Sequence, residues 1–209
     1  MSTEPLFIDF SDLNIGERVS ALEPKPGICV FIDIVGSTAM KQESMQHWIG
    51  QIGNAFSYCN ALLAPFRPLK GIGDELMYFI EDADRGADGQ TPLQIYDALF
   101  QIANPDSPNI PQTKIVAAHC CNVFALTFLQ GKADYYGLDI DLTARLKSVQ
   151  PAPKERELII DHGFYNKIKE DYDKTGNQSD FYSFTKLHGP HTFSARGLPE
   201  PVTFYRAQA

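Results

Sequence analysis

Apolar residues recur along the chain at two spacings, and each spacing predicts one kind of secondary structure. The run "ICVFIDIV", residues 28–35, is almost wholly apolar and breaks at Gly36-Ser37-Thr38, which predicts a buried strand that enters a turn. Helical spacing follows, at Met45, Trp48, Ile49, Ile52 and Phe56. We therefore expect an amphipathic helix that ends before Pro65.

The middle of the chain predicts a hairpin, a second helix and further strands. Two short apolar runs in residues 67–82 flank Gly71-Ile72-Gly73-Asp74, which is typical of a hairpin. Residues 82–90 have the composition of a loop. Thr91-Pro92 then places a proline at the first position of a helix that runs to about Ala103. After a second loop, residues 113–130 predict one or two strands.

The last third predicts a helix from Leu138 to about Val149, a strand at residues 156–161 and a short helix at residues 162–172. A closing hairpin follows, with strands at residues 180–189 and 201–207. The first half of this order is a βαββαβ unit with its helices on one face. We therefore expect an α+β fold with a ferredoxin-like core, a mixed sheet and additional C-terminal strands and helix. Residues 27–209 form the predicted domain, and residues 1–26 a leader that packs on it.

Composition narrows the possible partners and the compartment. The 209 residues are 44% hydrophobic and 21% charged, and the formal net charge of −8 argues against nucleic acid or an anionic membrane as partner. No apolar stretch is long enough to span a bilayer, and the first residues lack the pattern of a signal peptide. The four cysteines lie mostly in apolar segments without metal-ligand spacing, which favours reduced thiols in a cytoplasmic protein.

Two acidic residues stand at neighbouring strand ends in this prediction. Asp33 interrupts an apolar strand, where a carboxylate is costly to bury unless its charge is compensated. Asp74 lies in the hairpin turn that the topology places beside that strand. Carboxylates beside glycines suit a hard divalent cation such as Mg²⁺ or Mn²⁺. The alternative is that Asp33 caps the turn through Ser37 and Thr38 while Asp74 is a solvated turn residue.

Three segments resemble the signature segments of class III nucleotidyl cyclases, in the family's order. They are "FIDIVGST", "KGIGDELMYF" and "ADYYGLDIDLTARL", and "SARGLPEPVTFY" resembles the closing segment. The resemblance spans about residues 27 to 206. Within the class, the third segment and the bare catalytic domain look most like the stand-alone bacterial pyrimidine cyclases of Pycsar anti-phage defence.

The resemblance implies closure of a nucleoside triphosphate to a 3′,5′-cyclic monophosphate with release of diphosphate. It implies that Asp33 and Asp74, with the Ile34 carbonyl, hold two Mn²⁺ or Mg²⁺ ions. One ion would lower the pKa of the ribose 3′-hydroxyl, and the other would neutralise the leaving diphosphate. A nucleotide-binding sensor that has lost turnover is the alternative from a different functional class.

Further residues receive roles from the same resemblance. Arg145 matches the family's transition-state arginine, and Arg196 stands where many members have a phosphate-binding lysine. Lys70 and Asp134 match the pair that reads the base, and Phe31 is placed among the nucleotide-binding residues. Outside the family pattern, Arg145 and Arg196 would be surface arginines, Lys70 would flank the hairpin, and Asp134 would cap a turn.

Two positions depart from the purine-cyclase pattern. Asp141 stands where purine cyclases have an asparagine that orients the ribose. A carboxylate there would repel the triphosphate unless a metal ion or Arg145 shields its charge. The usual glycine-rich central strand is "AAHCCNV", in which we expect His119 to be a packed strand residue.

The resemblance also implies the assembly and the product. In the family that the chain resembles, one subunit supplies the metal-binding acids, and the other supplies the base-reading and transition-state residues. The resemblance therefore implies a homodimer with shared sites. UTP is the expected substrate, with CTP and ATP as alternatives, because a donor–acceptor pair can read any of these base edges. Strand periodicity allows one of Tyr135 and Tyr136 to point inward, and a tyrosine that does so would shorten the base pocket to a single ring. A separate effector protein would read the cyclic nucleotide.

Overall fold

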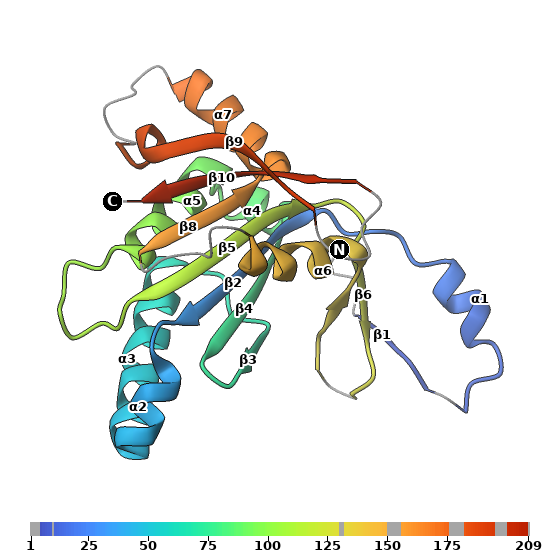
Figure 1. Ribbon diagram of the computed structural model, residues 1–209. Helices are drawn as coiled ribbons and strands as arrows, with labels where there is room; N and C mark the ends of the chain where they lie inside the picture. Colours follow the sequence, from blue (N-terminus) through green and yellow to red (C-terminus); the bar gives the residue numbers. More distant parts are fainter. Residues whose placement is uncertain are drawn as a thin grey trace.

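Two sheets organise the computed structural model of the chain, which describes residues 5–9, 11–129, 132–149, 156–175, 182–194 and 200–208 (Figure 1). The larger sheet has seven strands in the order β3-β4-β2-β5-β8-β10-β9. Their bounds are β2 Gly27–Ile34, β3 Lys70–Ile72, β4 Glu75–Glu81, β5 Thr113–Cys120, β8 Glu157–Asp161, β9 Leu187–Phe193 and β10 Val202–Gln208.

The four strands β3, β4, β2 and β5 lie in the order of a ferredoxin-like core, and each is antiparallel to its neighbours. β8 joins β5 in parallel, so the sheet is mixed, and the antiparallel hairpin β9–β10 completes it at the far edge. The expected α+β class, ferredoxin-like core and closing hairpin are thus confirmed. The first strand of that hairpin differs from its expected range, 180–189: residues 182–186 form a 3-10 turn, the strand runs over Leu187–Phe193, and residues 180 and 181 lie outside the described residues.

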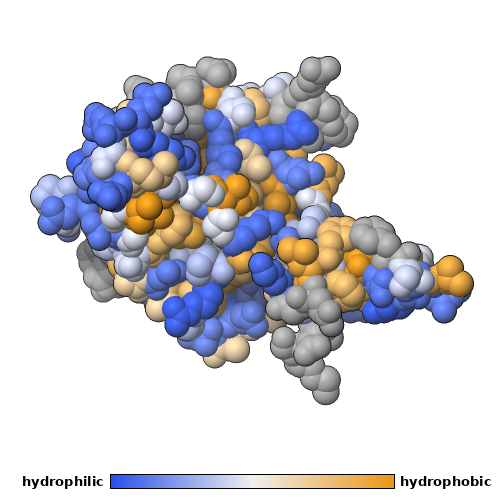
Figure 2. Space-filling model, turned by 90° about the horizontal axis from the view of Figure 1, so that it is seen from below, coloured by the Kyte–Doolittle hydropathy of each residue, from blue (hydrophilic) through white to orange (hydrophobic). Residues whose placement is uncertain are grey.

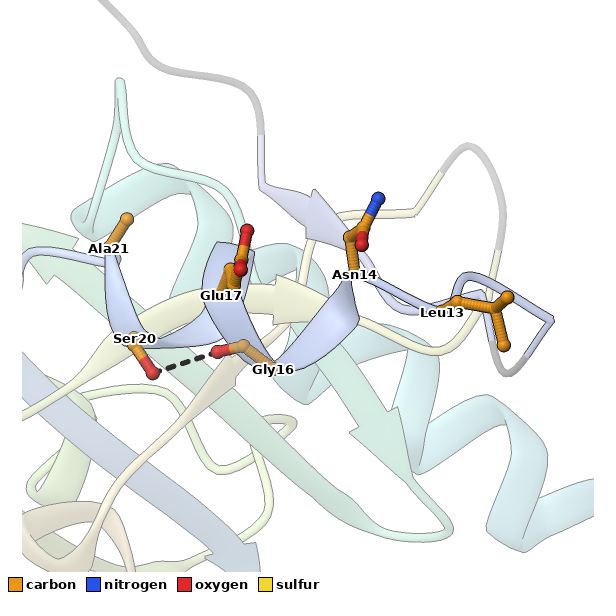
Figure 3. Close-up of a pocket in the computed structure, with 6 residues that line it drawn as sticks. All are labelled: Leu13, Asn14, Gly16, Glu17, Ser20 and Ala21. Atoms are coloured by element: carbon orange, nitrogen blue, oxygen red, sulfur yellow. Dashed lines mark hydrogen bonds between the residues drawn. The ribbon is translucent and has the colours of Figure 1, made fainter.

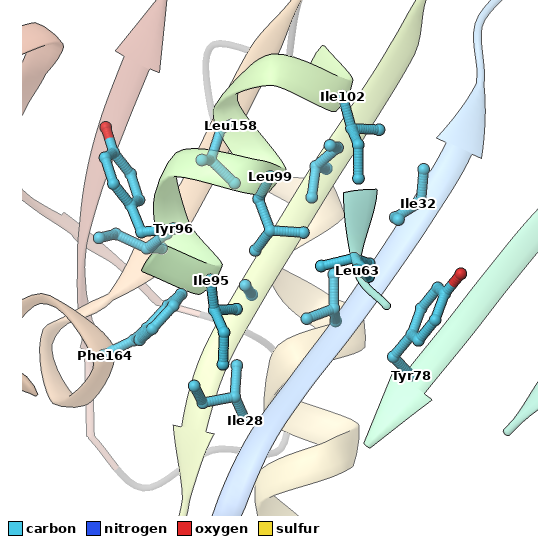
Figure 4. Close-up of a cluster of buried hydrophobic side chains, with 14 of the residues drawn as sticks. Ile28, Ile32, Leu63, Tyr78, Ile95, Tyr96, Leu99, Ile102, Leu158 and Phe164 are labelled. Carbon is cyan, nitrogen blue, oxygen red and sulfur yellow. The ribbon is translucent and has the colours of Figure 1, made fainter. Parts of the chain in front are cut away.

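Helices cover both faces of this sheet. Their bounds are α1 Ile15–Ser20, α2 Ser37–Glu43, α3 Met45–Leu62, α4 Asp82–Ala87, α5 Pro92–Ala103, α6 Leu138–Arg145 and α7 His162–Thr175, with 3-10 turns at Leu146–Ser148 and Tyr182–Lys186. The even-numbered side chains of β2 pack with α3, α5 and α7 in one core cluster (Figure 4). The odd-numbered ones, Cys29 and Phe31, pack with Ile140 of α6 and Leu146 on the opposite face.

The alternation along β2 explains why both of its faces are apolar. Neighbouring side chains of a strand point to opposite faces, and a strand covered on both sides reads as a continuous apolar run. Ile28, Val30 and Ile32 are at most 1% exposed, and Phe31 is 5% exposed. Asp33 is the single acid in the strand, so its position is fixed by packing on both sides.

A smaller three-stranded sheet lies beside the first, in the order β1-β6-β7, with bounds Leu6–Phe7, Phe124–Thr127 and Tyr135–Tyr136. β6 pairs in parallel with β1 and antiparallel with β7. Part of the expected leader therefore contacts the body of the protein through β1. Among the described residues no helix has the length and apolarity needed to cross a membrane.

Two segments differ from the sequence-based expectation. Residues 82–90 were expected to be a loop, but Asp82–Ala87 form α4. Acids in its first turn suit a helix N-terminus, and Arg85 bridges back to Asp82 at 3.3 Å. Residues after Gly36 form the short helix α2 rather than only a turn.

The predicted helix α3 is confirmed, but its apolar face is not all buried. Ala55 and Cys59 are its buried residues, whereas Met45 and Ile49 are 55% and 57% exposed. The N-terminal half of α3 extends past the sheet with α2, at the lower left of Figure 1. Its apolar side chains there are available for contacts outside the monomer.

Candidate active site

Asp33 is the penultimate residue of β2 and lies half-buried among charged neighbours. Burial raises the pKa of its carboxyl group, and the charges of Asp74 and Glu75 raise it further, whereas Lys147 and Lys114 lower it. In the sheet register Asp33 lies opposite Glu75 on one side and Lys114 on the other. This end of the sheet therefore concentrates negative charge.

Asp74 lies in the turn that joins β3 to β4, next to the end of β2. Gly73, with φ of +67°, takes the left-handed conformation that this turn requires. The Ile34 N–H donates to the Asp74 carbonyl at 3.4 Å, which ties the turn to β2. Burial would raise the pKa of Asp74, but hydrogen bonds from Ser37, a backbone N–H and Lys41 outweigh it, and the pKa lies below its usual value. The two predicted metal acids are thus brought together.

Helix α2 supplies contacts to Asp74 that the sequence did not single out. Gly36, with φ of +73°, turns the chain from β2 into α2, whose first residue Ser37 is buried. Lys41, one turn further, donates from Nζ to Asp74 Oδ1 at 3.3 Å. The Trp48 indole N–H donates to Ser37 Oγ at 2.8 Å. In the sequence, the one feature that could have indicated these contacts is the position of Lys41 shortly after Gly36-Ser37-Thr38.

A second lysine lies at the same end of the sheet. Lys147, in the 3-10 turn after α6, donates to the Glu75 carboxylate and lies 5.0 Å from the centre of the Phe31 ring. Phe31, expected among the nucleotide-binding residues, is 5% exposed and belongs to the core cluster beneath α6. Neither Glu75 nor Lys147 was predicted as a site residue, although Glu75 directly follows Asp74.

Lys70 and Asp134, the predicted base-reading pair, form an ion pair. Lys70 Nζ lies 2.9 Å from Asp134 Oδ1 and 3.2 Å from Oδ2. Both residues line a hollow of about 630 Å³ between the β3–β4 hairpin and the β6–β7 hairpin. The Asp134 carbonyl accepts from the Leu126 N–H at 3.2 Å, which fixes this acid to β6.

The two tyrosines after Asp134 point in different directions, as expected from strand alternation. Tyr135 lines the hollow, packs against Phe79 with ring centres 4.5 Å apart and ring planes tilted by 36°, and donates to Glu81 at 2.6 Å. Tyr136 is 39% exposed, and its hydroxyl donates to Asp134 Oδ2 at 3.1 Å. Tyr135 is therefore a fixed wall of the hollow.

Helix α6 presents Asp141 and Arg145 one turn apart, and both are exposed. The start of this helix lies close to the segment that follows β5. A Cβ on Gly137 would come within 2.1 Å of the Asn122 carbonyl oxygen, so a side chain does not fit there. This close approach explains the glycine in "YYGLDID". Arg196, the expected phosphate-binding residue, lies outside the described residues.

Other clusters lie away from these residues. His119 is packed, and its Nε2 pairs with Asp82 Oδ2 at 2.9 Å, in agreement with a structural role. A shallow hollow of about 620 Å³ along α1 is lined by none of the predicted site residues (Figure 3). Cys29, Cys59 and Cys120 are buried and Cys121 is exposed, all as free thiols.

Comparisons with known proteins give structural matches. No family model and no curated protein matches the sequence. The adenylyl cyclase CyaB from P. aeruginosa aligns with a TM-score of 0.68 and 16% identity, over 90% of this chain and 95% of that one. The guanylate cyclase domain of RhGC from Catenaria anguillulae, in complex with GTP, gives 0.66 and 15%, over 88% and 97%. A dimeric guanylyl cyclase domain from Blastocladiella emersonii gives 0.61 and 13%, over 88% and 96%.

The chain has the fold of a nucleotidyl cyclase catalytic domain. This cyclase fold brings Asp33, Asp74 and Glu75 together at one end of the sheet and Lys70 and Asp134 together in a separate hollow. The described residues contain no group of three or more His, Cys, Asp and Glu side chains arranged to hold a metal ion. Any cation between Asp33 and Asp74 would therefore need further oxygen ligands.

The proximity of the two acids in this cyclase fold predicts a coupled titration. Asp33 should titrate above the ordinary aspartate range, and Asp74→Asn should lower the pKa of Asp33 because it removes a like charge. Carboxyl-carbon NMR titration measures both values. Asp173→Asn, at an exposed residue paired with Lys169, is the matched control and should leave Asp33 unchanged. An Asp33 pKa that does not respond to Asp74→Asn would mean that the two carboxylates do not interact.

Proposed function

We propose that the protein is a nucleotidyl cyclase that converts a nucleoside triphosphate, UTP in the first place, to the 3′,5′-cyclic monophosphate and diphosphate. The observation that carries this proposal is the proximity of the Asp33 and Asp74 carboxylates, where the end of β2 meets the β3–β4 turn in a cyclase fold. Fold alone does not assign chemistry, so the residues at this strand end must supply it.

The donor set fits a divalent cation. Two carboxylates and the Ile34 carbonyl are the hard oxygen ligands that Mg²⁺ and Mn²⁺ prefer. A cation there would also offset the repulsion that raises the pKa of Asp33. Because the side chains supply few ligands, triphosphate oxygens would complete the coordination of two ions. When bound, the ions would activate the ribose 3′-hydroxyl and neutralise charge on the leaving diphosphate.

The exposed face of α6 supplies the remaining polar groups of the proposed site. Arg145 would stabilise charge on the phosphorus oxygens in the transition state through its planar fork of donors. Asp141 would accept a hydrogen bond from a ribose hydroxyl, one turn before Arg145. Arg196 would bind the terminal phosphates.

The hollow around Lys70 and Asp134 would receive the base. The ion pair offers one donor and one acceptor, which can satisfy the O4 and N3–H of uracil once the base lies between them. Tyr135, held by Phe79 and Glu81, would limit the depth of the hollow to a single ring. The same pair can also read cytosine or adenine, so CTP and ATP remain the alternatives.

Two copies of the chain would share each site, with the metal acids from one copy and Lys70, Asp134 and Arg145 from the other. Exposed apolar side chains on α3, on the β3–β4 and β6–β7 hairpins and at the start of α6 support such an assembly: Met45, Ile49, Ile72, Phe128, Leu129 and Leu138. Figure 2 shows apolar surface interspersed with polar surface on the face seen from below. The matched domain from Blastocladiella emersonii is described as a non-canonical dimer, and other structures of that domain are described as monomeric. The cyclic nucleotide would be a signal in anti-phage defence that a separate effector protein reads.

Turnover in the presence of Mn²⁺ tests the proposal. With all four triphosphates in competition, chromatography should find cyclic UMP as the main product, and Asp74→Ala should reduce turnover at least about 100-fold because an ion ligand is lost. Asp173→Ala, at an exposed acid on α7, should leave it unchanged. Cyclic AMP as main product would overturn the base assignment, and binding without diphosphate release would identify a sensor.

Mixing two inactive variants tests the shared site. Asp33→Ala and Arg145→Ala homodimers should each be inactive, whereas co-purified heterodimers should contain one intact site and regain up to about half of the wild-type activity. Mixing Asp33→Ala with Asp74→Ala should restore nothing, because both changes lie in the same half of the site. Full activity of a monomer in light scattering would refute the shared arrangement.

A further inference from the structure

The ammonium group of Lys41 is held between an acid of the proposed metal site and an aromatic ring. Its Nζ lies 3.3 Å from Asp74 Oδ1 and 4.4 Å from the centre of the Trp48 ring. Lys41 belongs to α2, and its two partners lie on other elements, Trp48 on α3 and Asp74 in the β3–β4 turn. An ammonium over an indole face gains electrostatic attraction from the ring, in addition to its hydrogen bond with the carboxylate.

The ring beneath Lys41 is itself fixed to the same acid. Trp48 donates through its indole N–H to Ser37 Oγ at 2.8 Å, and the Ser37 side chain lies close enough to Asp74 to lower the pKa of its carboxyl group. Ser37 is 4% exposed, so its hydroxyl is shielded from water. Asp74, Ser37, Trp48 and Lys41 thus form a closed ring of contacts. The lysine position is built into the fold of the α2–α3 pair.

A lysine in this place has a consequence for any divalent cation that binds Asp74. The cation must compete with the ammonium for the same carboxylate, since two positive groups cannot share one oxygen without repulsion. The displaced ammonium remains close to Asp74, because its stem starts on α2 and its ring partner stays in place. Phosphate oxygens that bind the cation would lie within reach of this ammonium and replace its lost anionic partner.

We infer that Lys41 is a positioning residue that couples cation binding to triphosphate binding, by exchanging its ammonium from Asp74 to a phosphate oxygen. The inference rests on the proposed function of Asp74 as a metal ligand. Lys41 weakens the binding of a cation that arrives alone. It strengthens the binding of a cation that arrives with a polyphosphate. By linkage, the polyphosphate must then raise the affinity for the cation to the same extent as the cation raises the affinity for the polyphosphate.

Lys41→Gln distinguishes this role from a structural tie between α2 and α3. By calorimetry, the variant should bind Mn²⁺ alone about two- to fivefold more tightly than wild type, and the Mn²⁺–tripolyphosphate complex about two- to fivefold more weakly. Tripolyphosphate is the probe because it lacks a base and a ribose. Loss of a purely structural contact would lower the melting temperature and could not change the two affinities in opposite directions.

Matched variants complete the test. Lys41→Met, which keeps the apolar stem over Trp48, should behave like Lys41→Gln, and Lys41→Arg should retain the wild-type pattern. Lys169→Gln, at an exposed lysine paired with Asp173 on α7, should change neither affinity. Trp48 is the chain's single tryptophan, so its emission should respond to Mg²⁺ in wild type and much less in Lys41→Met.

The outcomes separate the two hypotheses. If Asp74→Asn weakens Mn²⁺ binding but both Lys41 variants match wild type for both ligands, the coupling role is wrong and the metal site stands. If Asp74→Asn leaves Mn²⁺ binding unchanged, the metal site itself is wrong, and the role of Lys41 falls with it.

Discussion

The cost of a carboxylate at the end of a strand packed on both faces is the constraint on which the site depends. Asp33 follows directly on Phe31 and Ile32 of the two core clusters, and Asp74 and Glu75 bring further negative charge to it. Burial and like charge act in the same direction on its pKa. A sequence that retains three acids there needs positive charge, which Lys41 and Lys147 supply in part and divalent cations would supply in full.

The two lysines meet this need in the same way. Each donates to an acid, Lys41 to Asp74 and Lys147 to Glu75, and each lies over an aromatic ring, Trp48 or Phe31. The hollow proposed to receive the base repeats part of the arrangement, with Lys70 paired to Asp134 and 5.8 Å from the centre of the Tyr136 ring. At the proposed site, binding of the substrate and its ions would exchange ion pairs at Asp74 and Asp134, because each of these acids has a lysine partner.

Much of the fold could be predicted from local pattern. The apolar run of β2, the Gly73-Asp74 turn and the Thr91-Pro92 helix start are encoded by neighbours in sequence, and Thr91 forms the capping box with Gln94. The partners of the acids could not be predicted, because Lys147 and Glu75 are distant in sequence and meet only through the packing of α6 on the sheet. The exposure of Met45 and Ile49 could not be predicted for a similar reason, because helical spacing identifies an apolar face but not what covers it.

The most direct measurement of the central claim, that Asp33 and Asp74 hold the catalytic cations, is the anomalous scattering of Mn²⁺ in crystals grown with Mn²⁺ and a non-cyclisable α,β-methylene analogue of UTP. We predict anomalous peaks about 2.0–2.3 Å from carboxylate oxygens of both residues, with Lys41 moved from Asp74 to the phosphates. Peaks confined to other positions, with the analogue bound and Lys41 still on Asp74, would contradict the claim.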